Sequence, residues 1–392
     1  MVQVSRESRK LIIKLFGKID SQNAPEIEEK IREYLKADVP EAVILDLDEL
    51  EYSTSAGLRI FLRLKQEIRD TKVINAHADM YDVLDMTGFT EMMEVHKAYR
   101  VVSVEGCEVI GEGANGKVYR IDRDTILKAY HNPDALPEIQ RERELARMAF
   151  VAGIPTAIPY DVVKIEGGGY GTVFELLDAL SYAKLLARGI KSVDELAEMS
   201  IRLLKKIHSE TVEEGRIPDI KEVTLDRAAF LAEYLPEECA VKMLELIRAI
   251  PKDRRLLHGD YHLKNIMYQN GESLLIDMDT LCCGNPVFEL AGMYNAYVGF
   301  CAADPESQKS FMGISYETSR EFWQKSLELY MGTKDPAVLE AVENKVKILG
   351  LIRVMRRSIR RNDPPSEMFG RVIDYCYNEL VRLIPQTDSL VF

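Results

Sequence analysis

Short apolar runs and longer stretches with helical spacing alternate along the first hundred residues of the chain. The apolar runs predict strands, and AVILDLDEL, at residues 42–50, is nearly continuous, as is typical of a buried strand. In the stretches between, apolar residues recur every three or four positions, as on one face of an amphipathic helix. We expect strands at residues 10–19, 42–50 and 71–78, and helices at residues 23–36, 55–70 and 80–88. This alternation predicts an α/β domain with a mixed sheet and helices packed on it.

Near residue 103 the pattern changes, because strand-like segments cluster first and long helical stretches then dominate. One helical stretch opens with Ser192 and Glu195, the pair that forms a capping box. A small β-rich lobe followed by a helical lobe predicts an α+β fold of two lobes. The strands are expected at residues 107–113, 116–121, 125–130 and 171–177. The expected domains are 1–102 and 103–392, and the lobes of the second are about 103–178 and 179–392.

Glycines mark the turn between the first two strands of the second domain. Gly111, Gly113 and Gly116, followed by Val118, form the array G-x-G-x-x-G-x-V. A dinucleotide-binding Rossmann loop shares the glycine spacing but leads into a helix, whereas this array leads into further strands. Glycines in a strand–turn–strand let backbone N–H groups approach phosphates without an intervening side chain. The array therefore predicts a loop that binds the phosphates of a nucleotide.

A lysine on the third strand supports the same site. Lys128, within TILKAY, is placed to reach the α- and β-phosphates, a role that requires a carboxylate to hold the lysine. The next helical stretch offers Glu142 and Glu144, and we prefer Glu142 because it shares a face with apolar residues that should point inward. Taken alone, Lys128 would be an ordinary exposed strand lysine, but its context favours nucleotide binding.

The strongest chemical signal is the segment LLHGDYHLKNIMY, followed by LLIDMDT. Asp260 and Asn265 lie five residues apart, the spacing of a kinase catalytic loop, and Asp277 ends an apolar run where a metal-binding aspartate would stand. In that chemistry Asp260 accepts the proton of the acceptor hydroxyl, while Asn265 and Asp277 hold Mg²⁺ across the phosphates. Polar residues that only satisfy loop backbone would explain one of these three positions, but not several elements in this order.

Residues from about 104 to 392 resemble the aminoglycoside phosphotransferase and choline kinase branch of the protein-kinase-like fold. The likeness rests on HGDYHLKN, on IDMD and on IHS at residues 207–209. It implies that Asp260 is the catalytic base and that VFELL, at residues 173–177, is the hinge beside the adenine of ATP. One departure is Glu289, which stands in place of a usual aspartate and concerns packing of the helical lobe more than catalysis. The candidate ATP and Mg²⁺ site then comprises Gly111, Gly113, Gly116, Val118, Lys128, Glu142, Glu175, Leu177, Asn265 and Asp277.

The first hundred residues resemble the STAS domain of anti-sigma-factor antagonists, a regulatory or interaction domain. The matching parts are GKIDSQNAPEIEE and VILDLDELEYSTSAGLRIFL. In that family a serine just before A/S-G-L, at a helix start, is phosphorylated by a partner kinase, and Ser55 is the positional match. A phosphate there would meet free N–H groups and the positive end of the helix dipole. The alternative is that Ser53, Thr54 or Ser55 only caps the helix.

Two features bear on whether the phosphoryl acceptor is a small molecule or a protein. Gly259 stands where protein kinases have the arginine that reads a phosphorylated activation loop, and only six residues separate Asp277 from Gly284, which leaves no room for a peptide-docking segment. We therefore expect ATP- and Mg²⁺-dependent transfer to a small-molecule hydroxyl first. Phosphorylation of Ser55, in the same chain or in a partner, comes second. A nucleotide-binding pseudokinase that serves as an interaction module comes third.

Composition limits the classes of binding partner and the cellular location that we expect for the protein. The 392 residues carry a formal net charge of -13, which argues against general binding to nucleic acid or to an anionic membrane. The start of the sequence has no apolar run of signal-peptide type, and no run of about 18 apolar residues predicts a transmembrane helix. The six cysteines lack metal-ligand spacing and are expected to be reduced. These features predict a cytoplasmic protein.

Two stretches of the helical lobe leave alternatives open. The four arginines of MRRSIRRN and Arg353 just before it fall near one helix face, which would bind an anionic substrate, dock the first domain or simply be solvated. The aromatic residues of MYNAYVGF would contact a quaternary ammonium group or pack in the core. His208, His258 and His262 have no metal-ligand spacing and are interpreted as structural.

Overall fold

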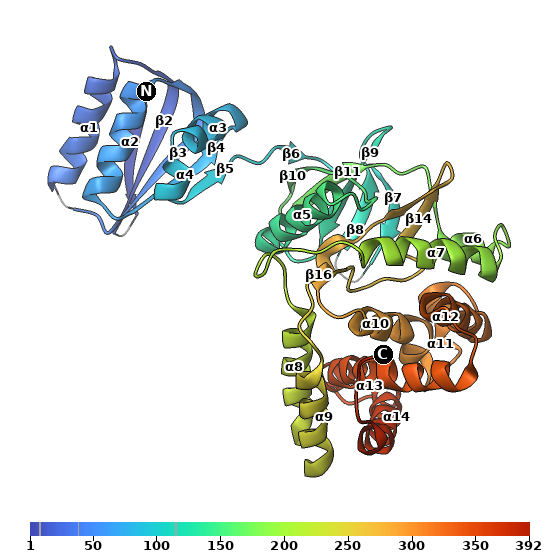
Figure 1. Cartoon of the computed structure of the whole chain (residues 1–392). Coiled ribbons are helices and arrows are strands. Elements are labelled where there is room, and N and C mark those ends of the chain that lie inside the picture. Colours follow the sequence, from blue (N-terminus) through green and yellow to red (C-terminus); the bar gives the residue numbers. More distant parts are fainter. Residues whose placement is uncertain (8, 38, 114–115) are drawn as a thin grey trace. The chain divides into compact units, whose positions relative to one another are not determined.

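The computed structural model describes residues 1–7, 9–37, 39–113 and 116–392. The chain forms two compact units, which can be followed in Figure 1. The first comprises Met1–Glu105 with Val162–Gly169, and the second comprises Gly106–Asp161 with Tyr170–Phe392. Over the described residues, no helix combines the length and the apolar character needed to cross a membrane.

The first unit is built on a five-stranded sheet in the order β1-β2-β3-β4-β5. β1 pairs antiparallel with β2, and the other neighbours pair in parallel, so the sheet is mixed as predicted. The strands are β1 (Val2–Glu7), β2 (Lys10–Ile19), β3 (Ala42–Ser53), β4 (Asp70–Ala76) and β5 (Val95–Lys97). The helices are α1 (Ala24–Ala37), α2 (Ser55–Glu67), α3 (Ala78–Met86) and α4 (Phe89–Met92).

The core of the first unit lies between its helices and the central strands. Leu45 on β3 and Phe61 on α2 are fully buried, and α2 packs against β3 and β4. The apolar run at residues 42–50 is thus a buried strand, as the sequence indicates. β1 was not among the predicted strands, because only Val2 and Val4 alternate there with polar residues and the strand lies at the sheet edge.

The second unit begins with antiparallel strands that carry the glycine array and Lys128. β7 (Glu108–Glu112), β8 (Gly116–Arg120), β9 (Thr125–Tyr130) and β11 (Tyr170–Glu175) pair in the order β7-β8-β9-β11. Helix α5 (Leu136–Val151) packs against β11. β10 (Pro159–Ile165), which was not predicted, pairs in parallel with β6 (Val101–Val102) through Lys164 and Ile165, and these paired residues belong to the first unit.

The rest of the second unit is mainly helical, as predicted. The helices are α6 (Tyr182–Ala187), α7 (Val193–Ile207), α8 (Ile220–Leu231), α9 (Glu237–Ala249), α10 (Val287–Tyr297), α11 (Ser307–Met312), α12 (Tyr316–Met331), α13 (Pro336–Arg361) and α14 (Glu367–Leu383), with short helices η1 (Ala232–Tyr234), η2 (Met278–Thr280), η3 (Gly299–Cys301) and η4 (Ile384–Gln386). The short strands are β12 (Leu180–Ser181), β13 (Leu256–Leu257), β14 (Ile266–Gln269), β15 (Glu272–Leu275) and β16 (Cys282–Cys283). The capping box is present, because Ser192 and Glu195 exchange side-chain and backbone hydrogen bonds at the start of α7.

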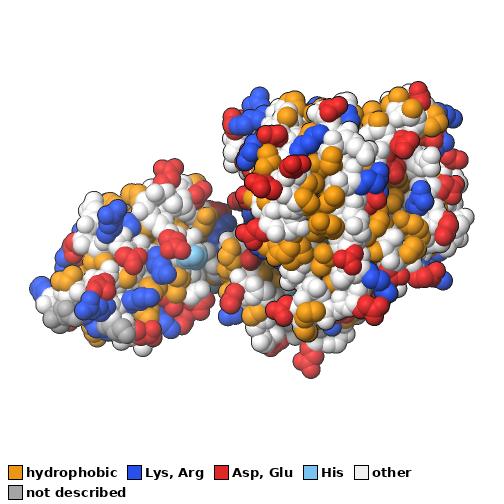
Figure 2. Space-filling model, turned by 90° about the horizontal axis from the view of Figure 1, so that it is seen from below, with side chains coloured by type: hydrophobic (Ala, Val, Ile, Leu, Met, Phe, Trp, Pro, Cys, Tyr) orange, Lys and Arg blue, Asp and Glu red, His pale blue; other side chains and the backbone are white. Residues whose placement is uncertain are grey.

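Helix α10 is the centre of the helical core and packs against α12 and α13. Tyr294 stacks edge-on against Trp323 at 5.8 Å between ring centroids, and Tyr297 lies 4.9 Å from Phe322. Both tyrosines are buried, so these aromatic residues of MYNAYVGF belong to the core rather than to a site for a quaternary ammonium group. All six cysteines are free thiols. Acidic, basic and hydrophobic side chains are interspersed on the face of the molecule that Figure 2 shows.

Candidate active site

The charged side chains of Lys128, Glu142 and Asp277 meet in the second unit. Lys128 Nζ donates to Glu142 Oε1 on α5 and to Asp277 Oδ1 beside η2, at 2.8 Å in each case. Only 16% of the Lys128 side chain is exposed, so it is not an ordinary surface lysine. Burial alone would lower the pKa of Lys128, but the charges of Asp277 and Glu142 outweigh it and raise that pKa above its usual value.

Local sequence explains how the pair forms. Lys128 follows the fully buried Leu127, so the alternation of β9 turns the lysine to the opposite face. On α5, Glu142 lies on the buried face with Leu145, whereas Glu144 is exposed. Glu142 also accepts a hydrogen bond from the Tyr130 hydroxyl, which fixes the second carboxylate oxygen.

The glycine array forms the turn between β7 and β8. Gly113 N–H donates to Gly116 O at 2.9 Å and closes the turn, while residues 114 and 115 lie outside the described part of the chain. A Cβ on Gly116 would lie 2.0 Å from the carbonyl oxygen of Ala129, so the close approach of β8 to β9 requires glycine there. Val118 pairs with Lys128 across the two strands, which brings the array and the lysine together.

The expected hinge follows the end of β11. Glu175 is the last residue of that strand, and its Oε1 accepts a hydrogen bond from Ile158 N–H at 3.2 Å. Leu176 N–H donates to Asp124 O at 2.8 Å, and Leu177 is half-buried beyond it. The segment is therefore held by one side-chain and one backbone hydrogen bond at the point where the chain leaves the strands for the helices.

Asp260 and Asn265 lie on the loop between β13 and β14. Asn265 Nδ2 donates to the backbone oxygen of Asp260 at 3.0 Å, which closes the loop on itself. The backbone oxygen of Asn265 accepts a hydrogen bond from Ile276 N–H at 3.0 Å, so the end of β15, and with it Asp277, lies beside the loop. Because Nδ2 is held by Asp260, the side-chain oxygen of Asn265 is left to bind another group.

The Asp260 carboxylate is 34% exposed and has a nitrogen-bearing side chain beside each oxygen. His262 Nε2 lies 3.3 Å from Oδ2, and Arg353 Nη2 on α13 lies 3.5 Å from Oδ1. Burial alone would raise the pKa of Asp260, but the hydrogen bond with His262 and the charges of His262 and Arg353 outweigh it and hold that pKa below its usual range. His262, interpreted from the sequence as structural, thus contacts the candidate base directly.

Glu289 of α10 positions the backbone that precedes Asp260. Its two carboxylate oxygens are buried and accept hydrogen bonds from His258 N–H at 2.5 Å and from Gly259 N–H at 3.0 Å. Gly259 has φ +81°, and a Cβ there would lie 2.2 Å from the carbonyl oxygen of Thr280. An arginine would therefore not fit at this position without a change of the backbone. The sequence marked Glu289 only as a departure in packing, whereas its contacts make it a positioning residue of the loop.

We predict that Glu289→Ala lowers both stability and activity. Two amide N–H groups, one buried and one half-buried, lose their acceptor, so the free energy of unfolding should fall by about 2–4 kcal/mol. Because the shifted loop carries Asp260, kcat should fall at least about tenfold. Chemical unfolding and ADP formation measure the two effects, and Glu289→Asp, which keeps the carboxylate, should recover part of each. Glu340→Ala, an exposed position on α13, is the control. Wild-type stability in Glu289→Ala would contradict this role.

A further carboxylate, that of Asp279, lies close to Asp277. Burial and the charge of Asp277 raise the pKa of Asp279 well above its usual range, and the charges of Glu142 and Asp260 add to the effect. Asp279 belongs to the motif IDMD but had no role assigned from the sequence. Within the described residues, no group of three or more His, Cys, Asp or Glu side chains is arranged to hold a metal ion. Mg²⁺ in kinases binds one or two carboxylates together with substrate phosphates, and the oxygens of Asn265 and Asp277 fit that requirement.

In the first unit, Ser55 is the first residue of α2 and is exposed. The cap of the helix is Thr54, whose hydroxyl oxygen accepts a hydrogen bond from Ala56 N–H at 3.3 Å. Ser53 is buried and donates to the backbone oxygen of Thr54 at 3.2 Å. Of the three hydroxyl residues that the sequence offered as caps, Thr54 therefore has that role, and the Ser55 side chain is not needed for it.

Comparison with known families assigns both units. A family model described as "Phosphotransferase enzyme family" matches residues 106–323, and one described as "STAS domain" matches residues 1–102. A search of curated proteins found no match to the chain. Both resemblances seen in the sequence are thereby confirmed.

Solved structures similar to the chain are aminoglycoside and choline-type kinases. The GDP complex of aminoglycoside 2'-phosphotransferase-IIIa has a TM-score of 0.50 and 12% identity, over 77% of this chain and 98% of that one. ADP-bound aminoglycoside phosphotransferase APH(2'')-Ib has a TM-score of 0.49 and 16% identity, over 80% and 99%. A choline/ethanolamine kinase family protein from Mesorhizobium loti has a TM-score of 0.47 and 14% identity, over 72% and 88%.

At such low identity, the likeness to aminoglycoside 2'-phosphotransferase-IIIa concerns the fold alone. The family model, in contrast, covers more than half of the chain and includes Lys128, Asp260 and Asp277. The chain therefore belongs to the phosphotransferase enzyme family, with a STAS domain preceding the kinase-like fold.

Proposed function

We propose that the second unit transfers the γ-phosphoryl group of ATP to the hydroxyl group of a small molecule, with Mg²⁺. The observation that carries this proposal is the meeting of Lys128 with Glu142 and Asp277 at 2.8 Å, beside the loop of Asp260 and Asn265. Kinases use these residue types to hold phosphates, bind metal and accept a proton. The glycine array, with Val118 opposite Lys128, would cover the phosphates.

In the proposed reaction the acceptor hydroxyl oxygen forms a bond to the γ-phosphorus as the bond from that phosphorus to the β–γ bridging oxygen breaks. The hydroxyl proton goes to the Asp260 carboxylate, and ADP leaves with the bridging oxygen. Lys128, fixed by Glu142, binds the α- and β-phosphates. When bound at Asn265 and Asp277, Mg²⁺ supplies charge neutralisation on the phosphates.

The segment after Asp277 supports a small-molecule acceptor. Residues 278–283 form η2 and β16, and Cys282 pairs with Leu257 on β13 immediately before the catalytic loop. The chain thus returns to the loop at once, without the long segment on which protein kinases bind a peptide. This connection favours an acceptor that enters as a free molecule.

Mg²⁺-dependent formation of ADP by the full chain, with a panel of aminoglycosides, amino alcohols, sugars and hydroxy acids, tests the proposal. We expect one class to stimulate ADP formation, with a requirement for Mg²⁺ and for Asp260. ATP that is bound but not converted with any of these compounds would instead favour a nucleotide-binding interaction module.

A second candidate function is phosphorylation of Ser55, favoured by its exposed position at the start of α2 beside a separate cap, Thr54. Transfer to a small molecule predicts that the intact mass of the purified chain stays unchanged after incubation with Mg·ATP. A gain of one phosphate that both Ser55→Ala and Asp260→Asn abolish would make Ser55 the acceptor and put this second candidate first. Thr54→Ser, which keeps a capping hydroxyl, is the matched control and should not change the result.

A further inference from the structure

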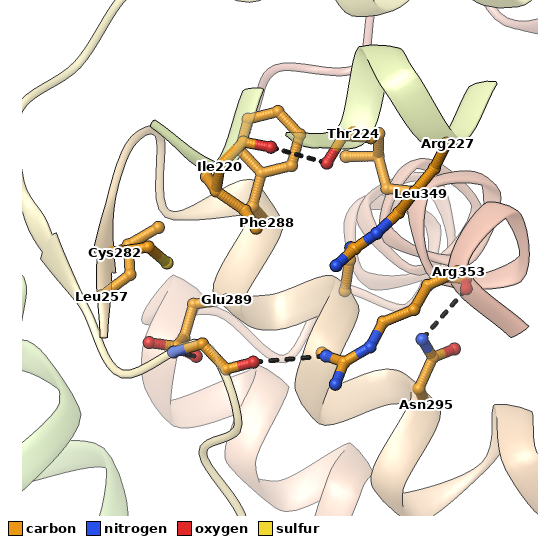
Figure 3. Close-up of a pocket in the computed structure, with 14 residues that line it drawn as sticks. Ile220, Thr224, Arg227, Leu257, Cys282, Phe288, Glu289, Asn295, Leu349 and Arg353 are labelled. Atoms are coloured by element: carbon orange, nitrogen blue, oxygen red, sulfur yellow. Dashed lines mark hydrogen bonds between the residues drawn. The ribbon is translucent and has the colours of Figure 1, made fainter. Parts of the chain in front are cut away.

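A small cavity lies beneath the catalytic loop, between α8, α10 and α13 (Figure 3). Gly259, the residue before Asp260, contributes to its wall. The side chains of Arg227 on α8 and Arg353 on α13 point into it. Its volume is about 30 Å³, which corresponds to about two water molecules. The space thus suits two or three oxygen atoms of a head group, not a whole nucleotide.

The cavity contains one positive charge, that of Arg227, which no described carboxylate pairs with, whereas Arg353 has Asp260 as its partner. Arg227 has no hydrogen bond or ion pair with any residue that the structure describes, although it is half-buried. Burial and the charges of Arg353 and Arg356 lower the pKa of Arg227 to about 10. Among the residues that line the cavity, Glu289 is the sole carboxylate, and its oxygens already accept the N–H groups of His258 and Gly259. A half-buried guanidinium group that faces a second one, with no carboxylate of its own, is unfavourable unless an anion binds beside it.

The same cavity is linked directly to the candidate base. Arg353 donates to Gly259 O at 3.2 Å and to Asp260 Oδ1 at 3.5 Å, so one guanidinium group faces both the cavity and the catalytic carboxylate. Arg357, one helical turn further along α13, lies close enough to Asp260 for that carboxylate to affect its pKa. A compound whose anionic group binds to Arg227 and Arg353 would therefore need only a few bonds between that group and a hydroxyl group bound at Asp260.

We propose that Arg227 and Arg353 form a subsite for an oxyanion, and that this oxyanion is part of the phosphoryl acceptor. The acceptor is then a small hydroxyl compound that also carries a carboxylate or phosphate group. Guanidinium groups bind both kinds of oxyanion through paired N–H donors, which explains the use of arginine here. The inference rests on the proposed function and narrows its substrate class from hydroxyl compounds in general to anionic ones.

The test uses the full chain and hydroxyl compounds in matched pairs that differ by one anionic group, such as glycerol with glycerate, glycerol with glycerol 3-phosphate, and ribose with ribose 5-phosphate. We expect ADP formation with an anionic member, and a KM at least about tenfold higher for its neutral counterpart. Arg227→Gln should raise the KM for the anionic compound at least about tenfold, the loss of one charge-assisted hydrogen bond. Arg361→Gln, the same change at an exposed position on α13, should leave that KM within about twofold.

A neutral or cationic hydroxyl compound as the best acceptor, or an unchanged KM in Arg227→Gln, would overturn the inference. The inference would also be wrong if free inorganic phosphate, acting through Arg227, stimulated ADP formation with a neutral acceptor, because the anion would then be a separate effector.

Binding of inorganic phosphate, followed by the midpoint of thermal unfolding, separates this subsite from the proposed function. We expect phosphate to raise the midpoint of wild type but not of Arg227→Gln. If phosphate raises the midpoint through Arg227 but no compound stimulates ADP formation, the subsite exists and the proposed reaction is wrong. If phosphate causes no rise in the midpoint that depends on Arg227, the subsite itself is wrong. Without phosphate, Arg227→Gln should unfold at or above the wild-type temperature, because a repelled, unpaired charge is removed. A clear fall would make Arg227 a structural residue.

Discussion

Asp260→Asn is expected to lower kcat by about 10²–10⁴-fold, the usual scale for removal of a general base. An amide is nearly the same size as the carboxylate but does not accept the hydroxyl proton, so substrate and nucleotide should still bind. Steady-state ADP formation, with ATP affinity measured separately, gives the result. Asp374→Asn, at an exposed position on α14, is the matched control and should retain full activity. Activity near wild type in Asp260→Asn would show that another group takes the proton.

The environment of Asp260 also fixes the sign of the pH dependence. Because His262 and Arg353 hold the pKa of Asp260 below its usual range, the carboxylate stays ionised from neutral pH down to at least the ordinary aspartate pKa, about 4. Protonation of Asp260 should therefore lower kcat/KM only below about pH 4. Arg353→Gln removes the guanidinium group beside that carboxylate and should move this acid limb to higher pH. An acid limb that Arg353→Gln leaves in place would belong to a different group.

Lys128→Met should lower activity with ATP by about 10²–10³-fold, as expected for loss of one preorganised electrostatic contact to the phosphates. It should also destabilise the fold, because Glu142 is 4% exposed and would remain buried without its cation. Removal of one partner of a buried ion pair typically costs about 3–5 kcal/mol. ADP formation and the free energy of unfolding in denaturant measure the two effects separately.

A second substitution separates the two roles of Lys128. In Lys128→Met with Glu142→Gln, no buried carboxylate at position 142 is left unpaired, so much of the stability should return while activity stays low. Recovery of activity together with stability would contradict a phosphate-binding role and would leave Lys128 as a purely structural cation.

Local sequence patterns correctly predicted helices and strands whose formation depends mainly on the residues within them. The apolar run at residues 42–50 became β3, and the Ser192–Glu195 box starts α7, because both features act over a few neighbouring residues. β1 and β10 were missed, since their strands are specified by the partners with which they pair more than by their own composition.

In the candidate site, too, the sequence predicted residues that lie close together in the chain but not those that only the folded structure brings together. Asp260 and Asn265 lie within one loop, so their spacing alone placed them together. Arg353 is 93 residues from Asp260 in the chain, and only the packing of α13 brings it to the carboxylate. The sequence showed Gly259 in place of an arginine and Glu289 in place of an aspartate, but it did not show why these residues are needed. The steric limit set by Thr280 O and the two amide hydrogen bonds to Glu289 exist only in the folded loop.

Phosphorus NMR of the full chain with Mg·ATP and a pool of hydroxyl compounds follows phosphoryl transfer to a small molecule, with the intact mass of the protein recorded on the same sample. We expect a phosphomonoester signal to grow at the rate at which ADP forms, Asp260→Asn to abolish both, and the protein mass to stay constant. A phosphate found on the chain itself, or ATP that is bound and never consumed, would contradict this expectation.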